Sequence, residues 1–447
     1  MASTQYRGLT VFISDIRNCK TKEQEQLRVN RELANIRTKF TSKNGTNTSY
    51  KRKKYVWKMV YMFMLGHEID FGHMEVIALI QSQKFSEKVV GYMAIATMLH
   101  HSQEMMTMVV NSVKTELQGT NDYAKCLAMS TVGNLGGVDF AVALSKHVQR
   151  LLVDTSSSPN VIKNSALCLL RIYRSHSEAL DTMEWLPKIA TLMDHRHYGV
   201  VISTAALLMG MVSNLNADVH DIGAVHDCVV PRCCEVLYRL AVMRTVPDEY
   251  KYYGTPTPWL QIKLLKILQY FDPPTAPTSV QHLRDVLTKI LTKTEVTKSV
   301  NKNNADHAVL FEAVNLIIHH DSDVADSMRD KAVGLLGRFI SVREPNIRYL
   351  GLDTMSRLAR IESTTELIKR HQSTILYSLK DADISIRKRA LDLLFSMCDE
   401  TNSAEIVREL LDYLTVADHG IKEEMVLKIA ILAERYAPDY QVSASRL

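Results

Sequence analysis

The sequence predicts an all-α fold in which pairs of helices stack into a solenoid. Three observations predict it. The chain has 447 residues, too many for one ordinary hydrophobic core, so it forms several domains or a repeat array. Apolar residues recur at helical spacing in blocks of roughly 12–20 residues, and the 17 glycines and 11 prolines fall mostly between these blocks. Related blocks also return at a regular distance along the chain.

The repeat is clearest in the last third of the chain. Three segments begin with a small or turn residue, then Ile, then a basic residue, then an apolar helical stripe: 346–358, 385–397 and 420–432. Their basic residues, Arg348, Arg387 and Lys422, are 39 and 35 residues apart. Segment 161–173 has the same pattern, and 200–212 follows with its own stripe. This period predicts about ten HEAT/armadillo-like helix pairs in a right-handed α-solenoid.

Individual helices follow from the same periodicity. Residues 21–40 are predicted to be amphipathic, with an apolar side made of Leu27, Leu33, Ile36 and Phe40. Segment 158–174 begins with a Ser cap and a Pro in its first turn. Segment 304–320 is apolar on two faces, which predicts a helix buried between neighbours. One helix is expected over 260–270, and the polar breaks around it are too short to separate domains.

We therefore predict one continuous trunk over residues 1–447. Its last helix, 420–436, is apolar on more than one side, although a terminal solenoid helix normally has a polar outer face. We expect a fragment, a spliced form, or a protein whose end a partner covers.

Cysteine usage and hydropathy predict a protein with reduced thiols and without a membrane-spanning segment. The seven cysteines are odd in number, scattered and without a C-x-x-C pair, which predicts reduced thiols in the cytosol. Apolar runs such as 59–65 are far shorter than the roughly 20 residues of a membrane span. The N-terminus has no apolar signal core. Any membrane contact is therefore expected to be peripheral.

No motif predicts catalysis. His319, His320, Asp321 and Asp323 are grouped at the polar end of a predicted helix, where His favours the helix dipole. The "HRHYG" stretch at 195–199 is predicted to be a turn, and "GNLGG" at 133–137 lacks the spacing of a phosphate-binding loop. We expect a non-enzymatic protein, without metal or cofactor, that binds partners along its faces.

The first 58 residues carry an unusual charge. Fourteen Lys and Arg against four Asp and Glu give them a net charge of +10, whereas the whole chain carries +5. Residues 49–59, "SYKRKKYVWKM", hold five cations without an acid. A helix over 49–65 puts Lys51, Lys54 and Lys58 on one face. It puts an apolar set on the other: Val56, Met59, Val60 and Phe63. We expect this helix to anchor in the core and present its cations to an anion.

The basic run predicts a weak, salt-sensitive phosphate site, because each cation gains on the order of 1 kcal/mol near an anionic leaflet. Tyr55 can add a hydroxyl. A solvated charged face and a nuclear localisation signal remain open alternatives. Nucleic acid is a third, but no RNA- or DNA-binding motif accompanies the run, so we expect no nucleic acid partner.

Several stretches occur in order from Arg7 to about Tyr440, among them "FISDIRNCK", "YKRKKYVWKMVYMFMLGHEIDFGHMEVI", "TPWLQIKLLKILQYFDPP" and "HAVLFEAVNLIIHHDS". Together they resemble the alpha-adaptins, large subunits of the plasma-membrane clathrin adaptor complex. The combination of "FISDIRNCK" with "GHEIDFGHMEV" is specific to the adaptin group, and we favour alpha over gamma. The resemblance covers nearly the whole chain apart from the tail, 437–447.

The resemblance implies a trunk that pairs with beta, mu and sigma subunits in endocytosis and reaches clathrin indirectly. It implies a phosphatidylinositol bisphosphate site within the basic region 1–58, whose family residues match Arg52, Lys53, Lys54, Tyr55 and Lys58. Arg17 matches a family arginine beside the pocket for acidic dileucine cargo signals. The implied location is the cytosolic face of the plasma membrane, in clathrin-coated pits.

Alpha-adaptins continue through a second half of the trunk, a hinge and an ear, so the resemblance is to the N-terminal part of the trunk. The alternative from another class is a nuclear transport receptor or other helical-repeat carrier. Such a receptor would show an acidic inner face, whereas the charge bias here is basic and local.

Overall fold

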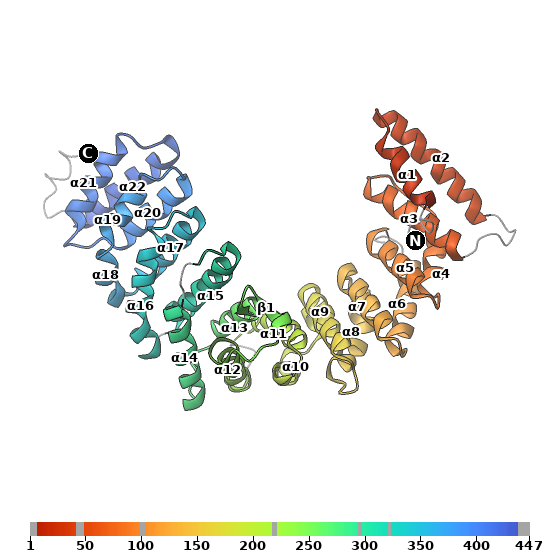
Figure 1. Cartoon of the computed structure of the whole chain (residues 1–447), viewed down its shortest axis with the longest axis horizontal. Helices are drawn as coiled ribbons and strands as arrows, with labels where there is room; N and C mark the ends of the chain where they lie inside the picture. The colour runs from red at the N-terminus through yellow and green to blue at the C-terminus, as the bar shows by residue number, and fades with distance from the viewer. Residues whose placement is uncertain are drawn as a thin grey trace. The chain divides into compact units, whose positions relative to one another are not determined.

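Helices make up nearly all the regular structure of the protein (Figure 1). The computed structural model describes residues 7–41, 49–98, 103–216, 221–293, 297–320 and 323–436. Contacts divide the chain into two compact units, residues 1–225 and 226–447. Each unit is a run of stacked helices, so the prediction of an all-α solenoid is confirmed.

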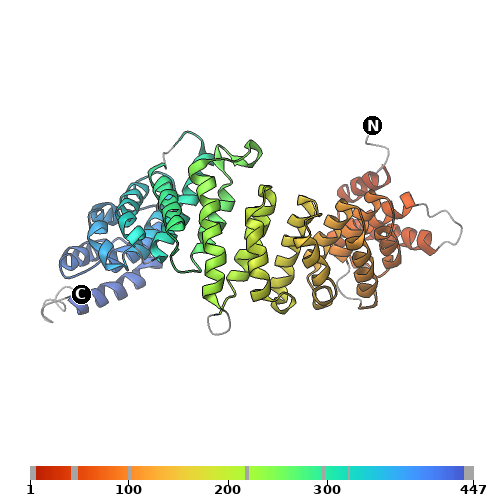
Figure 2. The same cartoon turned by 90° about the horizontal axis from the view of Figure 1, so that it is seen from below.

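The first unit contains eleven helices and the start of a twelfth within the described residues. They are α1 (Arg7–Arg17), α2 (Lys22–Thr41), α3 (Ser49–Met64), α4 (His73–Ile80), α5 (Phe85–Met98), α6 (Gln103–Gln118), α7 (Asp122–Leu135), α8 (Val138–Val153), α9 (Pro159–Ser175), α10 (Thr182–Thr191), α11 (Tyr198–Val212) and α12 (Ile222–Tyr238), with short 3₁₀ turns η1 (Ser177–Ala179) and η2 (Leu192–Asp194). Helix α9 packs on α7, α8 and α11, and Figure 2 shows this region as successive side-by-side helices. Each pair thus buries its apolar faces against the next pair.

The second unit continues the same arrangement. It holds the rest of α12, η3 (Arg239–Met243), η4 (Asp248–Tyr250), β1 (Lys251–Tyr252), β2 (Thr255–Pro256), α13 (Pro258–Leu268), α14 (Pro277–Lys293), α15 (Val300–His319), α16 (Asp323–Phe339), α17 (Pro345–Leu358), α18 (Glu362–Lys369), α19 (Gln372–Ser378), α20 (Ile384–Ser396), α21 (Ser403–Leu414) and α22 (His419–Tyr436). Helix α15 packs on α13, α16 and α17, and α20 packs on α17, α19 and α22.

The repeat segments all fall on helices. Segments 161–173 and 200–212 lie in α9 and α11, and the three late segments lie in α17, α20 and α22. Helix α9 begins at Ser158 with Pro159 in its first turn, as predicted, although the Ser158 side chain makes no capping hydrogen bond. Helix α15 is buried along much of its length, including Leu310, Val314 and Ile317.

The predicted apolar side of α2 is wrong at one position, Leu27, which is 68% exposed. Nine residues separate Leu27 from Ile36, and at 100° per residue that puts them on opposite faces of the helix. The buried stripe instead runs through Val29, Glu32 and Ile36. It therefore includes a carboxylate.

A two-stranded hairpin was not predicted. Lys251 pairs with Pro256 and Tyr252 pairs with Thr255, so Tyr253 and Gly254 form a two-residue turn. Both have positive φ, 47° and 83°, as a type I′ turn requires. Gly254 adopts this conformation freely, whereas Tyr253 does so under strain.

The histidine pair His319 and His320 lies at a helix end, as predicted. Helix α15 ends at His319, and the buried ring of His320 lies 3.2 Å from the carbonyl of Leu268. Asp321 lies outside the described residues, and Asp323 begins α16. Burial raises the pKa of the Cys168 thiol to about 12 and that of Cys398 to about 11, so both thiols stay protonated. No described helix is both long enough and apolar enough to span a membrane.

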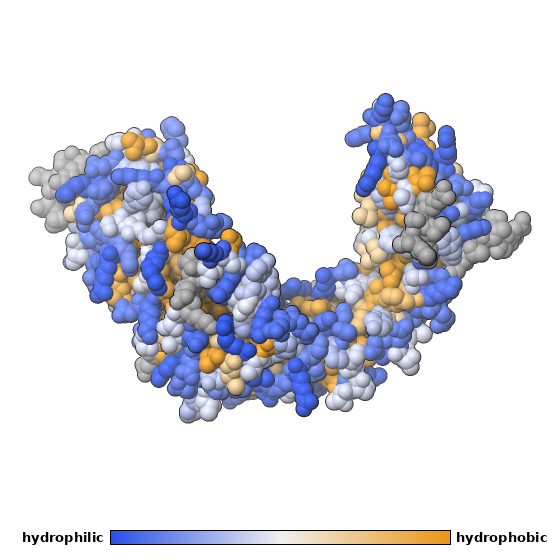
Figure 3. Space-filling view, viewed as in Figure 1, coloured by the Kyte–Doolittle hydropathy of each residue, from blue (hydrophilic) through white to orange (hydrophobic). Residues whose placement is uncertain are grey.

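Helix α22 has apolar side chains on two sides, as predicted. Ile421, Met425 and Ile429 are buried, whereas Leu427 is 62% exposed and Val426 is also exposed. Figure 3 shows hydrophilic side chains over most of the visible surface, with smaller hydrophobic patches among them.

Candidate functional site

The basic run lies on α3, which packs against α1 and α2 at the start of the first unit. The three helices share a core that consists of Phe12, Ile16, Val29, Ile36, Tyr55, Met59 and Met62. No Gly or Pro interrupts residues 49–64, and α3 ends just before Gly66, whose φ is 95°. The amide of His67 donates back to the Met62 carbonyl at 3.2 Å, which satisfies one of the last carbonyls of the helix.

Lys58 does not face solvent as the helical pattern predicted. Its Nζ donates to Oε1 of Glu32 at 2.6 Å, and both side chains are only 8% exposed. Arg28 donates to the second oxygen of Glu32 at 2.9 Å and to Asp15 at 3.0 Å. Lys58 and Arg28 also lie over the Phe12 ring, 5.2 and 4.8 Å from its centre. The charge of Lys58 is therefore matched inside the protein.

Glu32 stays ionised beneath the basic run. Burial by itself would raise the pKa of Glu32, but hydrogen bonds from Lys58 and Arg28 outweigh it and lower the pKa below its ordinary value. Glu32 thus joins α2 to α3 through Lys58, and Arg28, which also bonds Glu32, joins α2 to α1 through Asp15.

The ammonium of Lys54 is partly buried and lies near another cation, Lys58. Burial lowers the pKa of its ammonium, and repulsion from Lys58 lowers it further, against the attraction of Glu32. Its Nζ lies 4.7 Å from the centre of the Tyr55 ring. A Cβ at Gly8 would lie 3.3 Å from Cδ of Lys54, so the glycine leaves room for the lysine stem. An anion beside Lys54 would offset the repulsion between the two ammonium groups.

The remaining residues of the predicted lipid site differ in exposure. Lys51 is exposed, Arg52 is half-buried, and Lys53 is buried at 5% exposed. The Arg52 Nε is buried and has no hydrogen-bond partner among the described residues. Tyr55 is 7% exposed and packs edge-on against Phe40, 6.0 Å between ring centres. The structure thus brings the cations together, with Lys51, Arg52 and Lys54 the more accessible.

Arg17, the predicted cargo-signal residue, is the exposed last residue of α1. A cation there is favoured by the helix dipole. The position leaves the guanidinium available to a ligand.

Sequence reasoning missed Glu32 and Arg28. The signal for Glu32 was present, because seven residues separate Val29 from Ile36 and Glu32 falls between them on the same face. An acid on an apolar stripe predicts a buried partner. The identity of that partner was not predictable, since Lys58 is 26 residues away in sequence.

Comparison with known proteins gives a family match over nearly the whole chain. The family described as "Adaptin N terminal region" matches residues 25–445. The AP-2 complex subunit alpha-1 of Arabidopsis thaliana is 49% identical over 98% of this chain and 42% of its own length. The AP-2 complex subunit alpha-2 of Dictyostelium discoideum is 44% identical over 98% of this chain and 44% of its own length.

A gamma subunit is less similar to this chain than these alpha subunits are. The AP-1 complex subunit gamma of Dictyostelium discoideum is 31% identical over 96% of this chain and 45% of its own length. The chain thus spans less than half the length of these relatives. A chain in a homology model of the full-length AP-3 complex shares the fold, with a TM-score of 0.56, 20% identity, and coverage of 88% of this chain and 67% of that chain.

Proposed function

This chain belongs to the adaptin family, and from that premise we propose that it is a non-enzymatic clathrin-adaptor subunit of the AP-2 alpha kind. In this role it binds phosphatidylinositol bisphosphate on the cytosolic face of the plasma membrane, in coated pits. Higher identity to AP-2 alpha subunits than to an AP-1 gamma subunit supports the alpha assignment. Beta, mu and sigma subunits are the proposed partners, and contact with clathrin is indirect.

The lipid site is α3, and one observation carries this proposal. Five cations lie in the first ten residues of α3, and Lys58 is paired with Glu32, whereas Lys51, Arg52 and Lys54 form no ion pair among the described residues. Lys51, Arg52 and Lys54 are left with surplus positive charge near the surface. A bisphosphate headgroup neutralises that charge and accepts hydrogen bonds from the same groups. Lys53, Tyr55 and Lys58 are buried, and in this proposal they support the accessible cations from the protein side.

The test is binding to vesicles of phosphatidylcholine that contain phosphatidylinositol 4,5-bisphosphate. The triple variant Lys51→Glu/Arg52→Glu/Lys54→Glu should lose about 3 kcal/mol, roughly a hundredfold in affinity, because each cation contributes about 1 kcal/mol. The matched control changes three exposed lysines of the second unit: Lys331→Glu, Lys380→Glu and Lys388→Glu. Equal binding by the α3 variant and the control would refute the lipid site.

Cargo recognition is proposed at Arg17, at the exposed end of α1. A chain complexed with the small sigma subunit should bind an acidic dileucine peptide, and Arg17→Ala should weaken that binding about tenfold through loss of a charge-assisted hydrogen bond. Vesicle binding should not change. An unchanged peptide affinity would remove Arg17 from the cargo site.

A further inference from the structure

The second unit holds a cavity of about 510 Å³ beneath the β1–β2 hairpin. It lies among the hairpin, the end of η3, and helices α14 and α15. A volume of this size matches small-molecule sites in proteins, and it is much larger than a single inorganic phosphate needs.

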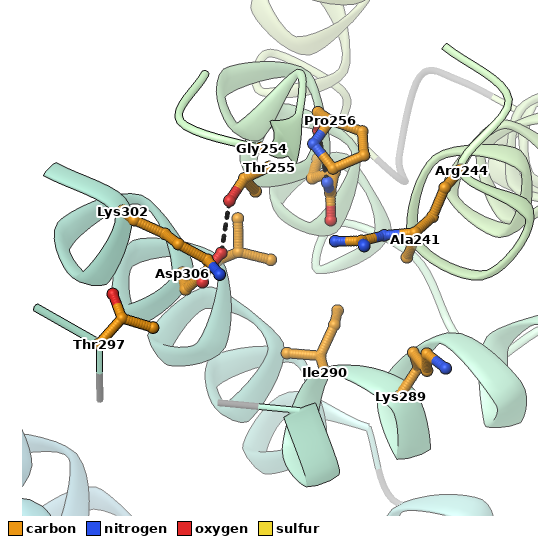
Figure 4. Close-up of a pocket in the computed structure, with 12 residues that line it drawn as sticks. Ala241, Arg244, Gly254, Thr255, Pro256, Lys289, Ile290, Thr297, Lys302 and Asp306 are labelled. Carbon is orange, nitrogen blue, oxygen red and sulfur yellow. Dashed lines mark hydrogen bonds between the residues drawn. The ribbon is translucent and has the colours of Figure 1, made fainter. Parts of the chain in front are cut away.

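The charged groups around this cavity are mostly cationic. Arg244 follows η3, Lys289 lies on α14 and Lys302 lies on α15, so three separate segments each supply one cation. Figure 4 shows the side chains of Arg244 and Lys302 pointing toward each other from opposite sides, with Lys289 below Arg244 in the view and its amino end turned away from the space between them. None of the three forms an ion pair with an acid among the described residues.

Among the described residues of the lining, Asp306 is the one acid, and it already accepts a hydrogen bond. The hydroxyl of Thr255 donates to Oδ1 of Asp306 at 2.6 Å, which ties the hairpin to α15 (Figure 4). The described lining therefore keeps a net charge of +2, with its positive groups on different walls.

The backbone is strained at the same place. Arg244 has φ of 57°, and Tyr253 and Thr257, at the tip and base of the hairpin, have φ of 47° and 33°. Non-glycine residues persist in this region when surrounding structure imposes it, and such residues cluster at ligand sites. Arg244, one of these residues, also lines the cavity.

We propose that this cavity binds a small molecule with several phosphate groups, such as an inositol polyphosphate. Cations on three walls fit a ligand whose phosphates point in several directions, and a guanidinium binds phosphate through two parallel hydrogen bonds. The site lies in the other unit from α3 and is independent of the proposed lipid site.

Calorimetry with inositol hexakisphosphate tests the proposal on the whole chain. We use the Lys51→Glu/Arg52→Glu/Lys54→Glu background so that α3 does not contribute. Lys289→Glu/Lys302→Glu should weaken binding roughly tenfold to a hundredfold, as expected for lost charge-assisted hydrogen bonds. The matched pair Lys380→Glu/Lys388→Glu should leave the affinity within about twofold, since general charge effects are screened at physiological salt.

A second variant separates ligand binding from folding. Arg244→Gly removes the guanidinium and relieves the positive-φ strain, so the variant should unfold no earlier than the parent while it binds about tenfold more weakly. If the α3 background does not bind inositol hexakisphosphate, or if both cavity variants bind it like the control, the proposal is overturned.

Vesicles with phosphatidylinositol 4,5-bisphosphate identify the source of the phosphates. Residual vesicle binding that depends on Lys289 and Lys302 would assign the cavity to a lipid headgroup. Binding of the soluble compound alone would assign it to a free polyphosphate. If the Lys51→Glu/Arg52→Glu/Lys54→Glu variant binds these vesicles as tightly as the parent does, and the cavity still binds inositol hexakisphosphate, the proposed lipid site is refuted and the cavity site is not.

Discussion

Helices α3 and α20 both carry a short basic run, and the two runs are used differently. In α20, Arg387 pairs with Asp418 at 2.7 Å, and Arg389 pairs with Asp392 at 3.1 Å and Asp353 at 3.4 Å. In α3, Lys58 pairs with Glu32, whereas Lys51, Arg52 and Lys54 form no ion pair among the described residues. A basic run thus predicts a ligand site only where neighbouring helices do not supply matching acids.

The acids that decide this outcome are remote in sequence. Asp353 lies on α17, one repeat before Arg389, and Asp418 precedes α22, one repeat after Arg387. The repeat therefore pairs charges between successive helices of the second unit. At α3 the preceding helix α2 supplies one buried carboxylate, Glu32, for several cations.

The largest expected effect is at Lys58, which is ion-paired as Arg387 and Arg389 of α20 are. Lys58→Met should lower the free energy of unfolding by about 3 kcal/mol, at the low end for a broken buried pair, because Arg28 still donates to Glu32. Chemical denaturation followed by circular dichroism measures this.

Glu32→Gln/Lys58→Met should recover most of that loss, since no unmatched buried charge remains. The pKa of Glu32 is lowered in the folded protein, so its stabilisation is present above about pH 4.5 and is lost as the pH falls through the folded pKa. A double variant no more stable than Lys58→Met would show that packing, not charge, holds this site.

A smaller effect is expected in α20. Arg389→Met removes contacts with Asp353 and Asp392 and hydrogen bonds to the Tyr349 hydroxyl at 3.0 and 3.1 Å. The guanidinium is partly exposed, so the free energy of unfolding should fall by about 1 kcal/mol. Vesicle binding should stay at the parent level, and a weakened affinity would mean that α20 also meets the membrane.

The smallest effect on stability is expected at Lys54. Because burial and Lys58 lower its pKa, the unfolded chain holds this proton more tightly, and stability rises with pH between the folded pKa and about 10.5. Lys54→Met should remove that rise and leave stability at pH 7 unchanged or up to about 0.5 kcal/mol higher. Thermal unfolding from pH 7 to 10.5 measures the slope.

The same Lys54→Met variant should bind vesicles several-fold less tightly. A clear loss of stability at neutral pH would show instead that Lys54 is a structural cation like Lys58. Gain in stability with loss of binding is the pattern expected of a ligand site.

Local periodicity was sufficient to predict the helices and the position of α3, because each depends on residues within one or two turns, and the repeat of 35–39 residues was sufficient to predict their stacking. It failed at Leu27, where spacing was counted without the 100° rotation per residue. Local periodicity also predicted that Lys58 faces solvent. The helical pattern of α3 alone does not show that α2 places Glu32 beside Lys58.

The cavity under the hairpin was unpredictable for the same reason, as Arg244, Lys289 and Lys302 are spread over 59 positions. The hairpin gave one usable signal, a Tyr-Gly pair at its turn.

Gly8 has a consequence for how long a headgroup would stay bound at the proposed lipid site. By leaving room beside Lys54, it lets the lysine stem lie against α1 while the ammonium rests over the Tyr55 ring. A free lysine side chain loses on the order of 1.5–2 kcal/mol of rotational freedom when it becomes fixed. At Lys54 much of this loss occurs as the protein folds, so at the proposed lipid site we expect a bound headgroup to dissociate more slowly for the same contacts.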